Sequence, residues 1–286
     1  MPAQRAVVIT GTSSGIGEAC ALHLDRLGFR VFAGVRKHTD GEALRRKASP
    51  MLQPVRLDIT SSEEIRAAAD VVRQAAGESG LAGLVNNAGI VVAGPLEFLP
   101  LEEIRRQLEV NVTVQIAVTQ AFLPLLRQGR GRVVFIGSNS GRMSTPYLGP
   151  YCASKFALEA VTDALRMELL PWGLSVSIVD PGNIRTPIWE KSAAAAQTLI
   201  EQMTEEAHRL YDPAIAAIQR AAAQEARTAS PADCVAQAVV EALTVKKPRT
   251  RYYVGKQAKV SVLLARLLPG RMLDSLILRH LGLPGP

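Results

Sequence analysis

The chain of 286 residues is poor in the side chains that build disulfide frameworks and metal sites. Its three cysteines, Cys20, Cys152 and Cys234, are far apart and lack CxxC spacing, which argues against a disulfide framework and against a zinc site. The four histidines are scattered, and an isolated histidine is more often structural than catalytic. We therefore expect no metal, and the free thiols fit a reducing compartment.

Long hydrophobic runs are also missing, since no run of eighteen apolar residues occurs. The amino terminus leads into a predicted strand without a signal-like segment. We therefore expect no membrane span, no export and a cytoplasmic location. The net charge is +7 at pH 7, but the basic residues are dispersed and no nucleic-acid-binding motif is present, so we expect no nucleic-acid partner.

Short apolar runs alternate with amphipathic stretches along most of the chain. The runs are residues 6–10, 30–35, 55–57, 83–86, 132–137, 175–180 and 251–254. This alternation is typical of βαβ units, and it predicts an α/β Rossmann fold with a doubly wound, mostly parallel, seven-stranded sheet and helices on both faces. Hydrophobic residues make up 48% of the chain, enough for a core on each face.

No Gly- or Ser-rich linker divides the chain, so we expect one domain. Residues 1–258 form its dinucleotide-binding catalytic part, with a substrate lobe at about 187–230 that contains a long helical segment at 190–227. Residues 259–286 are predicted to form two short amphipathic helices that extend the same domain. The sequence leaves three placements open for them: over the substrate cleft, at a subunit interface or on a membrane surface. It favours packing on the core or on a subunit partner.

A glycine-rich turn follows the first predicted strand. It reads Gly11-Thr12-Ser13-Ser14-Gly15-Ile16-Gly17 and opens a helix. Glycines let the backbone approach a pyrophosphate closely, and the amide hydrogens of the first helical turn favour its negative charge. The turn therefore predicts a nucleotide ligand, although its Gly-x3-Gly-x-Gly spacing differs from the commoner dinucleotide fingerprint.

A phenol and an ammonium are placed together by the segment Tyr151-Cys152-Ala153-Ser154-Lys155. Residues at i and i+4 are neighbours on a helix surface. An ammonium beside a phenol favours the phenolate, so we expect Lys155 to lower the pKa of Tyr151 toward working pH. Alone the pair is equally typical of a partly buried tyrosine beside a solvated lysine.

Together these motifs resemble the classical short-chain dehydrogenases/reductases over about residues 5–255, closest in wording to the branch of retinol, hydroxysteroid and 3-hydroxybutyrate dehydrogenases. The resemblance rests on the glycine turn, Asn86-Asn87-Ala88-Gly89, Asn111, Ser138, Tyr151, Lys155 and Pro181-Gly182. It implies an NAD(P)H-dependent oxidoreductase that interconverts an alcohol and a ketone or aldehyde by hydride transfer.

The resemblance also implies roles for four residues. Tyr151 would be the acid/base, Lys155 would tune it and bind the nicotinamide ribose, and Ser138 would stabilise charge on the substrate oxygen. Asn111 would hold a water in a proton relay with the lysine. Ser140 is the rival of Ser138, and a turn or capping role is open to both serines.

For the cofactor, the resemblance implies a larger set of contacts. They are Gly11, Ser13, Ser14, Gly15, Ile16, Gly17, Arg36, Asp58, Ile59, Asn87, Ala88, Gly89, Tyr151, Lys155, Pro181, Gly182, Ile184 and Thr186. After the second strand the usual acidic position is Val35, followed by Arg36 and Lys37, and two cations without a carboxylate favour NADP(H) over NAD(H). Both are also typical of ordinary solvated loop residues. Asp58 resembles the adenine-contacting aspartate, with capping of the next helix as its alternative.

The substrate is predicted to be a small lipophilic alcohol or carbonyl compound of steroid, retinoid or fatty type. Its pocket is predicted from Val91, Val92, Met143, Tyr147, Leu148, Ile188 and Trp189. The resemblance further suggests a homodimer or homotetramer through the helices at 102–127 and 151–170. Two alternatives stay open: a catalytically silent dinucleotide-binding module, and an epimerase or dehydratase of a related fold.

Overall fold

The computed structural model describes residues 5–285, and its centre is a seven-stranded parallel sheet in the order β3-β2-β1-β4-β5-β6-β7. The strands are β1 (Ala6–Ile9), β2 (Arg30–Val35), β3 (Leu52–Arg56), β4 (Gly83–Asn86), β5 (Arg132–Ile136), β6 (Ser175–Pro181) and β7 (Arg251–Val254). The order reverses between β1 and β4, the point at which doubly wound sheets bind ligands beyond the strands' carboxyl ends. The predicted fold class is confirmed.

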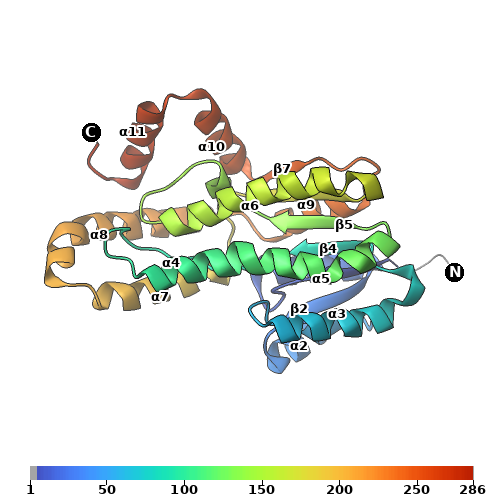
Figure 1. Cartoon of the computed structure of the whole chain (residues 1–286). Coiled ribbons are helices and arrows are strands. Elements are labelled where there is room, and N and C mark those ends of the chain that lie inside the picture. Colours follow the sequence, from blue (N-terminus) through green and yellow to red (C-terminus); the bar gives the residue numbers. More distant parts are fainter. Residues whose placement is uncertain (1–4, 286) are drawn as a thin grey trace.

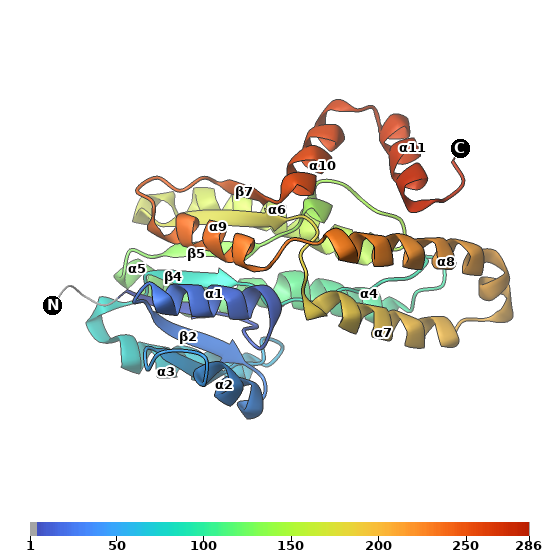
Figure 2. The same cartoon turned by 180° about the vertical axis from the view of Figure 1, so that it is seen from behind.

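Helices cover both faces of the sheet (Figures 1 and 2). They are α1 (Gly15–Arg26), α2 (His38–Arg45), α3 (Ser62–Ala76), α4 (Leu101–Leu108), α5 (Val114–Gln128), α6 (Gly149–Glu168), α7 (Pro187–Glu201), α8 (Glu205–Thr228), α9 (Asp233–Thr244), α10 (Lys256–Leu267) and α11 (Gly270–Leu281). Short turns of 3-10 helix lie at η1 (Gly77–Ser79), η3 (Asn139–Gly141) and η4 (Leu170–Trp172), and a π-helical turn, η2, spans Glu109–Thr113.

Two hydrophobic clusters hold these layers together, because successive strand residues point to opposite faces. Val8, Phe32 and Phe135 face α3, α5 and α6 in one cluster. Val7 and Val134 face α1 and α9 in the other. Both clusters are almost fully buried, which explains the near-continuous apolar runs of the central strands.

Two predicted boundaries are wrong. The third strand begins at Leu52 rather than Val55, because the edge position of β3 tolerates Pro54, which cannot donate to a ladder. The predicted long helical segment at 190–227 is interrupted, because it consists of two helices, α7 and α8, separated at 202–204. Thr204 begins the second by accepting the Ala207 N–H at 3.2 Å. Figure 1 shows both helices extending past the carboxyl edge of the sheet.

One continuous helix, Leu101–Gln128, comprises α4, η2 and α5 and is long and apolar enough to cross a bilayer by length and composition alone, with a mean hydropathy of 1.2 in its most apolar window. Core helices of soluble proteins meet the same criterion. Here Val118, Phe122 and Leu126 pack into the core cluster against the sheet. By length and composition the helix is weak evidence against the expectation of no membrane-spanning segment, while its packing against the sheet is that of a core helix.

Candidate active site

The glycine turn lies at the carboxyl end of β1 and contacts two other predicted cofactor segments. Gly11 and Gly15 have φ angles of +68° and +62°, a region that side chains other than glycine rarely adopt. A Cβ on Gly11 would lie 2.8 Å from the Ala88 Cα, and one on Gly15 would lie 3.1 Å from the Thr186 Cγ2. A Cβ on Gly17 would lie only 2.2 Å from the Gly11 carbonyl oxygen, so Gly11 and Gly17 leave no room for a side chain at their positions.

Hydrogen bonds fix the end of β4 against this turn. The Asn87 Nδ2 donates to the carbonyl oxygens of Thr10 and Gly11 at 2.9 and 3.0 Å. The Thr10 hydroxyl oxygen accepts from the backbone N–H groups of Asn87 and Ala88 at 2.9 and 3.0 Å. Ser14 begins α1 without a side-chain capping bond, so the backbone cradle and the helix N-terminus fit a dinucleotide pyrophosphate.

Arg36 and Asp58 lie beyond the ends of β2 and β3. Arg36 is exposed. Burial alone would raise the pKa of Asp58, but hydrogen bonds from Thr60 and the charges of Arg36 and Arg56 hold it below its ordinary value. Ser61, not Asp58, caps α3 by accepting the Glu64 N–H at 3.2 Å, so the capping alternative for Asp58 is wrong. Ile59, which follows, is buried.

The remaining predicted cofactor residues follow β4 and β6 at the same edge of the sheet. Gly89 is close to Asn111, whose Oδ1 would lie 3.2 Å from a Cβ at that glycine. Pro181 ends β6, Gly182 follows it, and Ile184 is buried. Because a Cβ on Gly15 would lie 3.1 Å from the Thr186 Cγ2, the segment after β6 lies beside the glycine turn of β1.

Tyr151 and Lys155 lie on α6, both only 7% exposed. The Lys155 Nζ donates to the Ile136 carbonyl oxygen at 2.8 Å and lies 5.7 Å from the Tyr151 ring centroid. Ser138 follows β5, where its hydroxyl oxygen caps η3 by accepting the Ser140 N–H at 3.1 Å, and hydrogen bonding with the same hydroxyl lowers the pKa of Tyr151. Ser140 instead pairs with the Cys152 thiol. The structure therefore brings Ser138, Tyr151 and Lys155 together at the carboxyl edge of the sheet.

The expected direction of the Tyr151 shift is wrong. Burial raises the pKa of Tyr151 to about 12, and the hydrogen bond with Ser138 only partly opposes this. Burial also lowers the pKa of Lys155 to about 8. Desolvation disfavours the charged form of each group, and it outweighs the attraction that helical spacing alone predicts. In this structure Tyr151 is a neutral phenol at neutral pH.

Asn111 lies in the π-helical turn η2 and is buried. Its Oδ1 accepts the Ile90 N–H at 2.9 Å, while its Nδ2 donates to the Ile90 carbonyl oxygen and to the Ser154 hydroxyl at 3.0 and 3.1 Å. Asn111 therefore connects the segment after β4 with the helix that carries Tyr151.

Sequence reasoning missed two neighbouring amides with similar bonds. The buried Gln107 accepts the Val92 N–H and donates to the Ile90 carbonyl oxygen, and Gln115 donates to the Ala88 carbonyl oxygen. Gln107, Asn111 and Gln115 are four residues apart, so they share one helix face. That periodic stripe of amides was the available signal.

Asp180, at the end of β6, was also missed. It is fully buried, and its Oδ1 accepts the Ser138 N–H at 3.1 Å. Burial, and then the neighbouring Glu159, raise the pKa of the Asp180 carboxyl well above its ordinary value. An acidic residue ending an otherwise apolar strand, directly before Pro181, was the signal.

A partly buried ion cluster, centred on the buried Glu159, lies beside Asp180. The Arg142 guanidinium donates to both Glu159 oxygens at 3.0 and 2.7 Å, and the Arg251 Nε donates to one of them at 2.9 Å. These bonds connect the segment after Ser138 with α6 and β7. Because the Glu159 carboxylate is buried, removing both arginines would leave it without a compensating charge.

The seven residues of the predicted substrate pocket are spread around Tyr151 and the α7–α8 lobe, and Val92 among them is buried. The Trp189 ring lies 6.3 Å from the Tyr151 ring, and Tyr147 lies 6.1 Å from Tyr211. Tyr147 has a φ of +65°, an unusual conformation for a non-glycine residue. Val91 is buried, and its carbonyl oxygen accepts the Ser192 hydroxyl at 3.1 Å. Met143, Leu148 and Ile188 are partly buried.

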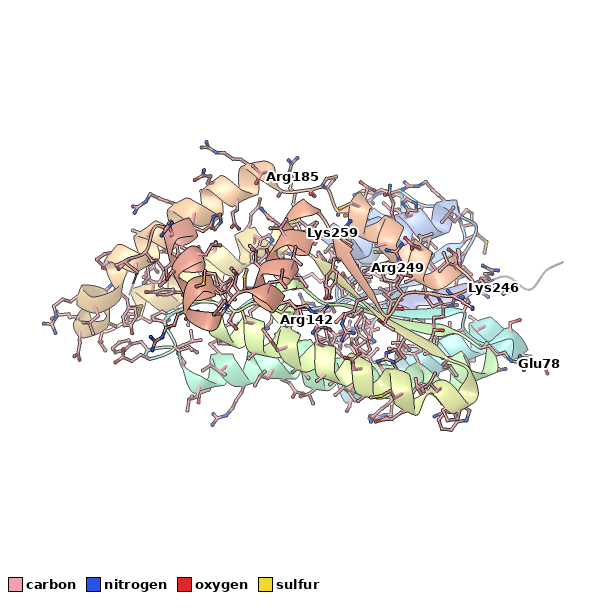
Figure 3. All side chains as sticks on the ribbon, turned by 90° about the horizontal axis from the view of Figure 1, so that it is seen from above. Glu78, Arg142, Arg185, Lys246, Arg249 and Lys259 are labelled. Carbon is pink, nitrogen blue, oxygen red and sulfur yellow. The ribbon has the colours of Figure 1, made fainter. Side chains whose placement is uncertain are left out.

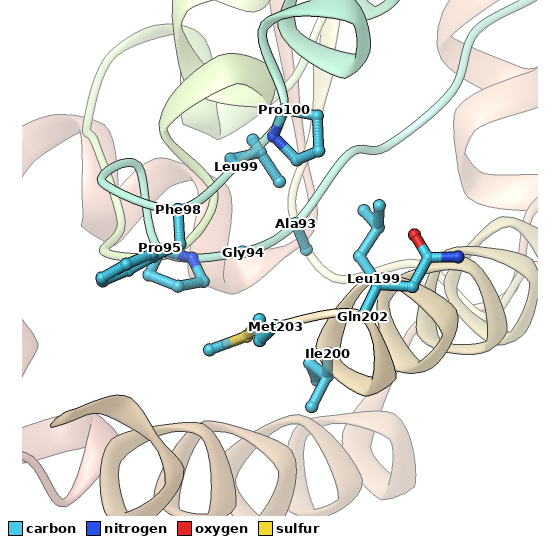
Figure 4. Close-up of a pocket in the computed structure, with 10 residues that line it drawn as sticks. All are labelled: Ala93, Gly94, Pro95, Phe98, Leu99, Pro100, Leu199, Ile200, Gln202 and Met203. Atoms are coloured by element: carbon cyan, nitrogen blue, oxygen red, sulfur yellow. The ribbon is translucent and has the colours of Figure 1, made fainter. Parts of the chain in front are cut away.

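None of these seven residues lines the apolar hollow of about 150 Å³ that lies between the β4–α4 loop and the end of α7 (Figure 4). Its lining is Ala93, Gly94, Pro95, Phe98, Leu99, Pro100, Leu199, Ile200, Gln202 and Met203. The hollow is nevertheless tied to the predicted pocket, because the Gly94 N–H donates to the Tyr147 carbonyl oxygen at 2.8 Å. Within residues 5–285 no group of three or more His, Cys, Asp or Glu is arranged to hold a metal ion.

Residues 5–197 match the family model of the short chain dehydrogenases. An NADPH-dependent 3-dehydrocapnine reductase of Ornithobacterium rhinotracheale is 35% identical over 97% of each chain. Retinol dehydrogenase 5 of Homo sapiens is 40% identical over 97% of this chain and 89% of the relative. The mitochondrial D-beta-hydroxybutyrate dehydrogenase of Bos taurus is 40% identical over 87% of this chain and 76% of the relative.

Solved structures agree in fold. A short-chain dehydrogenase from Streptomyces avermitilis has a TM-score of 0.75 at 26% identity, covering 92% of each chain. A short chain dehydrogenase from Burkholderia cenocepacia in complex with NADP has a TM-score of 0.69 at 26% identity, covering 94% of this chain and all of the neighbour. The chain belongs to the short-chain dehydrogenase family. It is an oxidoreductase that acts on CH–OH donors, and its cofactor is a nicotinamide dinucleotide.

The close packing around Asp180 gives a first prediction. A Cβ on Gly137 would lie 2.0 Å from the Asp180 Oδ1, so Gly137→Ala must displace the carboxyl that holds the Ser138 N–H. We expect a loss of about 1–3 kcal/mol in the free energy of unfolding and a lower kcat. Urea denaturation and steady-state kinetics measure both. Gly270→Ala, which meets open space, is the matched control. Equal effects in the two variants would contradict the role of this packing.

Proposed function

We propose that this protein interconverts a lipophilic alcohol with its ketone or aldehyde, using NADP(H), with Tyr151 as the acid/base. The observation that carries the proposal is the convergence of Ser138, Tyr151 and Lys155 at the sheet edge that also holds the glycine turn. When bound, the nicotinamide supplies or accepts the hydride.

Because the pKa of Tyr151 is raised, the phenol carries its proton at neutral pH and has it available for a substrate oxygen. In reduction the Tyr151 hydroxyl gives its proton to the substrate oxygen as the carbon gains hydride, and in oxidation the phenolate takes that proton back. Ser138 hydrogen-bonds the same oxygen and stabilises the charge that develops there. Lys155 binds the ribose hydroxyls with its ammonium, and Asn111 holds the water that links the lysine to solvent.

The dinucleotide is bound by the residues that surround the glycine turn. Its pyrophosphate lies against the backbone of residues 11–17 and the N-terminus of α1. Asp58 and Ile59 contact the adenine, residues 87–89 the adenosine side, and residues 181–186 the carboxamide. Arg36 binds the 2′-phosphate, which a carboxylate in place of Val35 would repel.

The lipophilic substrate class is supported by apolar and aromatic side chains around the acid. Trp189 lies edge-on to Tyr151, and Tyr147 contacts Tyr211 of the lobe formed by α7 and α8. A relative named for retinol supports the same class. A panel of steroids, retinoids, fatty ketones and 3-oxo acids, assayed with NADPH and NADH by nicotinamide absorbance, tests the proposal. Cofactor binding without turnover of any compound would overturn it.

The acid/base role predicts the effect of removing one oxygen. Tyr151→Phe keeps the buried ring but removes the proton donor, so we expect kcat/KM to fall by about 10²–10⁴-fold, the usual contribution of a general acid. Ser140→Ala is the control, because its hydroxyl pairs with Cys152 rather than Tyr151, and it should lose far less activity. Comparable losses in the two variants would contradict the assignment.

The lowered pKa of Lys155 predicts how activity depends on pH. Since burial lowers the pKa of Lys155 to about 8, its ammonium is present below that pH and is lost above it. We therefore expect kcat/KM for reduction to be steady below about pH 7 and to fall above about pH 8, the pKa of the free enzyme's essential cation. A kcat/KM profile that stays flat to about pH 10 would contradict the need for the charged lysine.

Arg36 predicts cofactor preference. Arg36→Asp replaces the cation with a carboxylate, so we expect the kcat/KM ratio of NADPH to NADH to fall at least about tenfold, since one charge-assisted hydrogen bond contributes ~1.5–3 kcal/mol. Arg45→Asp makes the same charge change at an exposed position on α2 and is the control. If the ratio is unchanged in Arg36→Asp, the preference for NADP(H) is wrong.

A further inference from the structure

The last two helices, α10 and α11, form a hairpin that stands out from the body of the molecule (Figures 1 and 2). We call residues 258–281 the terminal hairpin. Ala258, Ile277 and Leu281 are buried at its inner side, and the His280 Nε2 lies 3.0 Å from a Glu225 carboxyl oxygen on α8. The hairpin is therefore attached to the fold, and its other side faces solvent.

The solvent-facing side carries large apolar side chains. On α10, Val260, Leu263 and Leu267 are 55%, 55% and 67% exposed, and their spacing of three and four residues places them on one helix face. On α11, Met272 and Leu276 are exposed and four residues apart. Exposed apolar helix faces of this kind mark an interaction site.

Four cations flank these apolar residues, and they are Lys259, Arg266, Arg271 and Arg279. Asp274 is the single Asp or Glu between residues 258 and 281. Across residues 5–285, none of the four cations forms an ion pair with a carboxylate. Figure 3 looks onto this side of the molecule and labels Lys259 on α10. The surface therefore combines apolar side chains with positive charge that the fold leaves uncompensated.

We propose that the terminal hairpin is a docking surface for an anionic lipid bilayer. Its leucines, valine and methionine enter the boundary between headgroups and acyl chains, and its cations pair with lipid phosphates, as in interfacial amphipathic helices. A second copy of the chain fits this surface less well. A twofold interface places the same patch on both subunits and so brings two sets of uncompensated cations together.

The docking surface lies beside the proposed substrate site. A cavity of about 460 Å³ is lined by Ser144 and Pro146 on one side and by Asp274, Ile277 and Leu278 of α11 on the other. The same loop continues into Tyr147 and Leu148 and then into the helix of Tyr151. If the proposed function holds, docking presents this loop to the membrane from which a lipophilic substrate arrives.

Vesicle sedimentation with the full chain tests the docking. Vesicles of phosphatidylcholine with about 30% phosphatidylglycerol should bind the protein at least tenfold more tightly than vesicles of phosphatidylcholine alone, and added salt should weaken binding. The double variant Leu263→Glu/Leu267→Glu should lose at least tenfold in binding. The matched control is Leu27→Glu/Leu170→Glu, at leucines that are 52% and 63% exposed outside the hairpin, and it should bind like the wild type.

Circular dichroism melting verifies that both double variants are folded, and turnover of a water-soluble carbonyl substrate, if the wild type has it, should be unchanged in the hairpin variant. Failure of the wild type to bind anionic vesicles, or equal loss in the control, overturns the docking surface without touching the proposed function. Sedimentation equilibrium in the absence of vesicles tests whether a second copy of the chain covers this surface instead. If the wild type is an oligomer and the hairpin variant is not, the surface is a subunit interface and the proposal is overturned.

Discussion

The structure depends on how closely the backbone segments at the carboxyl edge of the parallel sheet approach one another. The Gly11 turn leaves no space for a Cβ against Ala88, and the Asn87 amide spans the carbonyl oxygens of Thr10 and Gly11. Because parallel strands all end at this edge, the turn after β1, the loop after β4 and the segment after β6 meet without long connections. The proposed contacts with cofactor and substrate all depend on the close approach of these segments.

Burial then decides the chemistry available to the side chains held there. In water a lysine beside a tyrosine favours the phenolate, but both groups are buried here, and desolvation acts on each separately. Tyr151 keeps its proton and Lys155 holds its own less tightly. The Lys155 ammonium is fixed by the Ile136 carbonyl oxygen rather than by the phenol, so the pair consists of a neutral donor beside an independently anchored cation.

The sequence predicts those features that one segment encodes by itself. The alternation of apolar runs is sufficient to predict the parallel sheet. The order of the motifs is sufficient to predict that Ser138 and Tyr151 lie at the same edge of that sheet. Contacts between distant segments were not predictable in this way. The proximity of Asp180 to Glu159 arises only when β6 and α6 pack together, and the sign of the Tyr151 pKa shift depends on a burial that spacing does not reveal.

Buried amides on the helix from α4 to α5 also fix the segment that follows β4 at the carboxyl edge of the sheet. A π-helical turn shifts the register of the helix from α4 to α5 at Asn111, and the amides of Gln107, Asn111 and Gln115 bond to the segment that follows β4. A buried amide without a partner is costly, so Gln107 and Asn111, whose amide oxygens and nitrogens are all hydrogen-bonded, favour a single position for that segment. Since Asn111 also bonds to Ser154, the same helix sets the distance between the cofactor edge of the sheet and the helix of Tyr151.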